Sequence, residues 1–131
     1  MDNIQFSYLY RDGSNYKRRG QVVFSNPDRL PNDFIEEELR QAFLPDRLFI
    51  AGQIRLPNVF LYMDGPFSFN DHCYHEFDLT SPTSETPNDM HRRSITEFVA
   101  EARREASRGW QVFDPYDSNS ATRWSQTPRA S

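Results

Sequence analysis

The sequence is short of the residues and motifs that most often identify an activity. It contains one cysteine, three histidines and a single lysine in 131 residues. It has no glycine-rich phosphate loop, no series of zinc ligands and no Gly-x-Ser-x-Gly turn. No run approaches the roughly 18 consecutive apolar residues of a membrane-spanning helix. These absences exclude the common nucleotide-loop enzymes, zinc-ribbon proteins and helical membrane proteins, and a lone Cys73 excludes an intramolecular disulfide.

The charge balance argues against general nucleic-acid binding. The net charge is -4, whereas non-specific affinity for nucleic acids comes from Lys and Arg that neutralise phosphates. Fourteen of the fifteen basic residues are Arg, which suits bidentate contacts and is also what a GC-rich genome produces. The length fits a single domain, predicted over residues 1–113, with a polar C-terminal tail at 114–131. The N-terminus lacks the pattern of a secretory signal, so we expect a cytoplasmic protein.

Hydrophobic periodicity predicts two strands and a helix in the first third of the chain. Apolar residues recur at every second position over 4–10, and a charged loop then leads to a second strand over 21–25. After Pro31, either Asn32 or Asp33 is expected to cap a helix that Pro45 ends. Its apolar face would comprise Ile35, Leu39, Ala42 and Phe43.

The rest of the chain predicts short strands and one more helix. Strands are expected over 48–51, 59–63 and 73–79, with 53–55 as a further candidate, and residues 80–93 are expected to connect them without regular structure. Ser94 and Glu97 form a capping box before an apolar stripe that ends near Gly109, after which Trp110, Val112 and Phe113 are expected to pack on the body. This order predicts an α+β fold with a small antiparallel or mixed sheet and two helices packed on one face.

Residues 70–77 concentrate the groups able to do chemistry. They hold two of the three histidines, the only cysteine and two carboxylates. His72 and His75 are three positions apart, which puts them on opposite faces of a strand and weakens the case for a shared metal ion. We therefore predict no metal and no other cofactor. His75 is interpreted as a core histidine with a hydrogen-bond partner, and Cys73 as a buried small side chain rather than a nucleophile.

Two site hypotheses remain open. In the first, Asp71 and His72 lie in a turn that approaches a loop carrying Asp12, Asn15 and Lys17, and His72, Asp71, Asp12 and Lys17 act in proton transfer and charge stabilisation. The same residue types also form turns and caps in proteins without activity. In the second, a partner-binding surface includes Phe67, Phe69, Arg11, Asn15 and Glu76.

Three motifs carry a resemblance. Tyr10-Arg11-Asp12 with Asn15-Tyr16-Lys17, then Val22 to Pro27, and finally Asp71 to Phe77 together resemble a group of short uncharacterised bacterial proteins. The resemblance covers about residues 6 to 79. It implies a bacterial or phage origin and a free-standing small protein, and it transfers no activity.

The favoured function is a non-catalytic protein-interaction factor of the accessory, inhibitor or immunity type, with a protein partner and no membrane or general nucleic-acid binding. The alternative is a small hydrolase or nuclease-like enzyme with its site around Asp71 and His72. A concave polar pocket beside those residues would favour the enzyme. A symmetric homodimer is compatible with an exposed sheet edge.

Overall fold

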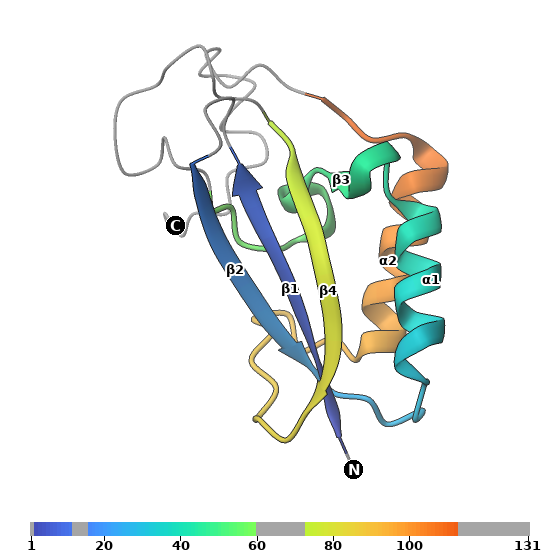
Figure 1. Ribbon diagram of the computed structural model, residues 1–131. Coiled ribbons are helices and arrows are strands. Elements are labelled where there is room, and N and C mark those ends of the chain that lie inside the picture. Colours follow the sequence, from blue (N-terminus) through green and yellow to red (C-terminus); the bar gives the residue numbers. More distant parts are fainter. Residues whose placement is uncertain (1, 12–15, 60–72, 113–131) are drawn as a thin grey trace.

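A curled antiparallel sheet carries both helices on one of its faces (Figure 1). The computed structural model describes residues 2–11, 16–59 and 73–112. The strand order is β2-β1-β4-β3, so β1 and β4 are central. The elements in chain order are β1 (Asn3–Arg11), β2 (Lys17–Phe24), α1 (Asn32–Ala42), η1 (Pro45–Arg47), β3 (Leu48–Phe49), η2 (Ala51–Ile54), β4 (His75–Thr83) and α2 (Ile95–Arg108). The predicted α+β class, with two helices on one face of a small sheet, is confirmed.

The core lies between the sheet and the helices and is rich in aromatic rings. The period-two positions of β1 all point into it, as the sequence predicts. The ring of Phe6 stacks on Phe77 of β4, with 5.2 Å between centroids, and meets Phe98 of α2 edge-on at 5.1 Å. Because offset and edge-to-face ring pairs add to simple burial, this arrangement fixes α2 on the sheet as well as filling the space.

A β-bulge in β4 reverses the faces of the residues that follow it. Ser7 lies opposite Leu79 and Tyr8 lies opposite Phe77, so Asp78 has no residue across from it on β1. Thr80 therefore faces the core, and Leu79 is exposed on the other side. Unbroken alternation along β4 would instead predict Leu79 on the buried face with His75 and Phe77, and that prediction is wrong because of the bulge.

Strand β4 is also longer than predicted, since residues 80–83 belong to it rather than to an irregular connector. Strand β3 is too short to cover the outer edge of this part of β4. Side chains form hydrogen bonds with that edge instead. Glu36 of α1 accepts a hydrogen bond from the Thr80 amide at 2.8 Å, and Arg47 donates to the Asp78 carbonyl at 3.1 Å. Two backbone groups on this edge are thus satisfied by side chains that a strand pattern does not reveal.

Other boundaries also differ from those predicted. Strand β2 begins at Lys17, four residues before the predicted start, and β3 has two residues instead of four. Residues 51–54 form a 3-10 turn, η2, instead of strand. The buried Gln53 explains the turn, because its amide bonds to Glu105, Gly109 and Gln111 near the end of α2. The predicted strand over 59–63 falls almost wholly outside the described residues.

The helix ends show one confirmed prediction and one error. Ser94 and Glu97 make the complete capping box of α2, with both reciprocal bonds present. Helix α1 instead follows Pro31 without a side-chain cap, and Asn32 accepts a hydrogen bond from Thr80 of β4 at 2.9 Å. A tertiary contact has replaced the expected local one. Neither helix in the described parts of the chain has the length and apolar character needed to cross a bilayer.

Close packing at Gly20 joins β2 to β1. A Cβ atom at this position would lie 2.8 Å from Cζ of Tyr8 and 3.0 Å from a methyl carbon of Val59. The hydroxyl of Tyr8 donates to the Pro57 carbonyl at 2.7 Å, which holds the ring in place. Glycine is needed here for close approach of the ring rather than for an unusual backbone angle.

The segment after α2 packs on the body in part. The indole nitrogen of Trp110 donates to the Ala42 carbonyl at the end of α1, at 3.0 Å, so this prediction is confirmed. Val112 is 60% exposed, so its predicted packing is wrong. Phe113 and the predicted tail at 114–131 lie outside the described residues.

Candidate functional site

The sequence singles out nine candidate site residues, and the structure describes three of them. Arg11 and Lys17 lie opposite each other at the ends of β1 and β2. Arg11 also donates from Nε and Nη2 to the two carboxylate oxygens of Glu76, at 3.2 and 3.3 Å. These three residues thus meet at one end of the sheet. The other six, Asp12, Asn15, Phe67, Phe69, Asp71 and His72, lie outside the described residues.

The outer face of the sheet, opposite the helices, carries a second cross-strand ion pair. Arg19 of β2 reaches Asp78 of β4 at 3.0 Å. Since β1 lies between those strands, the arginine stem must pass over β1, where Leu9 is almost fully buried. Long arginine stems commonly cover apolar surface in this way. The ion pair links the two strands that flank β1, which gives these charges a structural role.

His75 is part of the core, as predicted. It is fully buried, and its Nε2 accepts a hydrogen bond from the Val59 amide at 2.9 Å. The rings of Tyr8, Tyr10 and Phe49 surround it at 5.7–6.1 Å. Cys73 is buried nearby with Tyr10, which agrees with a packing role. Within the described ranges, no three His, Cys, Asp or Glu side chains are arranged to hold a metal ion.

The outer edge of β2 is open along half of its length. Asn88 exchanges two hydrogen bonds with the backbone of Val23, and Ser25 accepts one from the Ile95 amide, so the backbone groups of Val23 and Ser25 point away from β1. Backbone groups alternate in direction along a strand. Those of Lys17, Arg19 and Gln21 therefore also point outward, and no hydrogen bond reaches them from the described parts of the chain.

A small pocket lies where the open part of this edge ends. Its volume is about 160 Å³, and it is lined by Gln21, Val22, Pro57, Asn88, Asp89 and Met90. Met90 is 62% exposed. The pocket therefore combines an exposed thioether, a proline and a valine with the strand edge itself.

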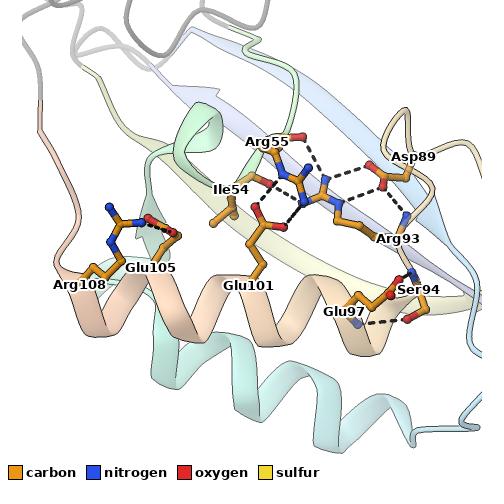
Figure 2. Close-up of polar contacts among 9 residues, drawn as sticks. All are labelled: Ile54, Arg55, Asp89, Arg93, Ser94, Glu97, Glu101, Glu105 and Arg108. Atoms are coloured by element: carbon orange, nitrogen blue, oxygen red, sulfur yellow. Dashed lines mark hydrogen bonds and ion pairs between the residues drawn. The ribbon is translucent and has the colours of Figure 1, made fainter.

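A buried network built on Arg93 holds the turn that forms one wall of this pocket (Figure 2). All five side-chain N–H groups of Arg93 are used, since they reach both oxygens of Asp89, one oxygen of Glu101, and two backbone carbonyls at 2.7–3.0 Å. These carbonyls belong to Ile54 and Arg55. The guanidinium also lies over the rings of Phe24 and Phe98, at 5.6 and 5.2 Å. Three separate segments are therefore joined by one side chain.

The carboxylates of this network are kept ionised by their partners. Burial opposes ionisation of Asp89, but hydrogen bonds and charge attraction from Arg93 are stronger, so its pKa is lowered. The pKa of Glu101 is also lowered: burial again opposes ionisation, and Arg55 together with Arg93 overcomes it. Sequence reasoning missed this network because it expected an irregular connector over 80–93. The spacing of Asp89 and Arg93 by four residues was the available signal.

Comparison of the chain with family models, with curated proteins and with solved structures found no match. The case for a function therefore depends on the geometry of the described residues.

Proposed function

We propose that this protein is a non-catalytic interaction factor that binds an extended segment of a protein partner as an additional strand on β2. The observation that carries the proposal is the open edge at Lys17, Arg19 and Gln21, whose backbone donors and acceptors face away from β1. Added strands derive affinity from such backbone groups and specificity from pockets for alternate side chains. The accessory, inhibitor or immunity role expected from the sequence is compatible with this mode.

The charges of the edge favour an acidic segment. Lys17, Arg18 and Arg19 follow one another at the open end of β2. A partner strand beside them would place an acidic side chain next to Lys17 on the outer face of the sheet, whereas Arg19 reaches Asp78 across β1. Opposite charges across neighbouring strands stabilise pairing, whereas like charges oppose it. The open edge of β2 is therefore basic, although the net charge of the protein is -4, and it favours an acidic partner segment.

The same charges argue against a second copy of this chain as the occupant. In an antiparallel pairing of two β2 edges centred on Arg19, that residue would face its own copy. Basic side chains on an exposed edge are a common protection against such self-pairing. We therefore favour a different protein over an edge-to-edge homodimer.

The pocket beside Gln21 supplies a specificity element for the partner segment. With a volume of about 160 Å³, it is large enough for one apolar side chain, and Met90 adapts readily to different shapes. The Arg93 network holds the pocket wall through Asp89, so the site is largely formed before binding. A preformed site reduces the ordering cost of binding. The expected ligand is an extended segment with an acidic residue and one apolar anchor.

The test compares two substitutions at Arg19. Arg19→Ala removes the side-chain charge and keeps the backbone N–H, whereas Arg19→Pro also removes the outward N–H without taking a donor from the β1 ladder. Tagged wild-type and variant proteins are used to capture partners from the native cell extract. Amide hydrogen exchange is then measured on the complexes.

We expect a partner that Arg19→Ala retains, that Arg19→Pro loses, and that slows exchange at Lys17, Arg19 and Gln21. A partner retained equally by Arg19→Pro, or protection confined to another face, would contradict the proposal. His72→Ala serves as a parallel variant. Loss of a measured activity only in that variant would favour the hydrolase or nuclease-like alternative, whose residues Asp12, Asp71 and His72 lie outside the described residues.

A further inference from the structure

A second hollow, between α2 and the turn that precedes it, is lined by charged side chains. Its volume is about 430 Å³, within the range of small-molecule sites. One wall is a single stripe of α2 at helical spacing: Glu97, Ala100, Glu101 and Arg104. The other wall contains Arg55 and the three consecutive residues His91, Arg92 and Arg93. Ala100 is exposed, and its small side chain leaves room within the hollow.

Both carboxylates that line the hollow already accept hydrogen bonds from other residues of the protein. Glu101 accepts hydrogen bonds from two arginines, with Nε and Nη2 of Arg55 at 2.9 and 2.7 Å and Nη1 of Arg93 at 3.0 Å. Glu97 accepts the Ser94 amide in the capping box. Both acids are therefore used to hold the walls in place.

Not all arginine side chains that line the hollow have a hydrogen-bond or ion-pair partner among the described residues. Arg92 and Arg104 are exposed, and neither side chain makes a hydrogen bond or ion pair within the described parts of the chain. Arg55 engages Glu101 through Nε and Nη2, and its side chain remains 47% exposed. The lining contains four arginines and two glutamates. Arg55 and Arg93 pair with Glu101 and Asp89, which leaves the charges of Arg92 and Arg104 without an ion-pair partner in the described parts of the chain.

Burial is the largest cause that lowers the pKa of His91. The charges of Arg55 and Arg93 lower it further, and those of Asp89 and Glu101 oppose the shift. Guanidinium groups bind phosphate oxygens through paired hydrogen bonds, and the two guanidinium groups of Arg92 and Arg104 match a dianion better than a single carboxylate.

We propose that this hollow binds the phosphate group of a small molecule, held by Arg92 and Arg104 with the remaining Nη donors of Arg55. The hollow exceeds the size of a single tetrahedral anion, so the ligand is a phosphate monoester rather than free phosphate alone. The phosphate lies over Ala100, and the rest of the ligand occupies the space toward His91. This site is independent of the proposed strand addition at β2.

The test uses the full chain, with inorganic phosphate and glucose 6-phosphate as probes and glucose as the uncharged control. Binding is measured by NMR titration of backbone amides and arginine Nε–H resonances. Arg104→Gln and Arg103→Gln form a matched pair, because they are neighbours on α2 and Arg103 instead pairs with Glu38 of α1. Ala100→Met fills the hollow without changing its charge. Far-UV circular dichroism confirms that each variant is folded.

We expect saturable shifts at Arg92 and Arg104 with both phosphate probes and none with glucose. Arg104→Gln should weaken binding about tenfold, Arg103→Gln should leave it unchanged, and Ala100→Met should weaken the monoester more than inorganic phosphate. The absence of saturable shifts in the wild type would overturn the proposal. Equal weakening by Arg103→Gln and Arg104→Gln would also overturn it, because that result indicates only a general loss of positive charge.

Discussion

Replacing Arg93 with methionine tests whether the buried network stabilises the fold as its geometry indicates. The substitution keeps much of the side-chain volume but removes five donated hydrogen bonds. Asp89 then loses its ion pair while its side chain is 3% exposed, whereas Glu101 keeps Arg55. Leaving one member of a buried ion pair without its partner costs about 3–5 kcal/mol. That is a large part of the roughly 5–15 kcal/mol that stabilises a domain.

Urea unfolding followed by far-UV circular dichroism measures this loss, and two arginines provide controls. The side chains of Arg55 and Arg103 are 47% and 64% exposed, and each contacts one carboxylate. Substituting either with methionine should cost about 1 kcal/mol or less, because exposed ion pairs contribute little. If Arg93→Met were no more destabilising than Arg103→Met, the network would not support the fold.

The pH dependence gives a second check on the same reasoning. The folded pKa values of Asp89 and Glu101 lie below their ordinary values, so their contribution is present above about pH 4.5 and is lost as the pH falls through the folded values. The stability difference between wild type and Arg93→Met should therefore shrink on acidification. A difference that stays constant from neutral to strongly acidic pH would refute the ionic account.

Three further predictions concern packing, capping and alkaline stability. Gly20→Ala should destabilise by about 1–3 kcal/mol, because the new methyl group meets Tyr8 and Val59; equal stability in urea unfolding would show that the ring moves freely. Ser94→Ala should cost about 1 kcal/mol through loss of the cap, whereas Ser94→Asp should retain most of the stability. Burial raises the pKa of Tyr8, so stability should hold below the ordinary tyrosine pKa near 10 and fall above it as the unfolded chain ionises. Tyr8→Phe should remove that component of the alkaline loss, and an unchanged alkaline profile in this variant would contradict the assignment.

The elements that depend only on short segments of the chain were predicted correctly from the sequence. The apolar alternation of β1 and the capping box of α2 are properties of short segments, and both are found as expected. The sequence did not predict the bulge at Asp78 or the turn at Ala51–Ile54, because each depends on contacts with distant segments. Residues 48–51 and 53–55 were predicted as strands, and only the partners of Gln53 near α2 explain the turn.

The candidate site also depends on contacts between distant segments, which local patterns do not predict. Arg11 and Glu76 were both selected as binding residues, and the structure pairs them with each other across the sheet. The open edge of β2 could not be predicted, because it depends on which backbone groups of the strand face outward. The hollow near Arg104 was missed because its two walls come from separate segments of the chain. Its second wall comes from a turn for which no structure was predicted.

The bulge at Asp78 also restricts how β4 can slide along β1. A regular strand can shift by two residues and still present the same faces, but a strand with one extra residue fits its neighbour only where that residue is accommodated. Asp78 is anchored twice, through its carboxylate to Arg19 and through its carbonyl to Arg47. A slip would break both anchors and bring Leu79 toward the core side in place of Thr80. The bulge at Asp78 therefore allows only one alignment of β4 on β1.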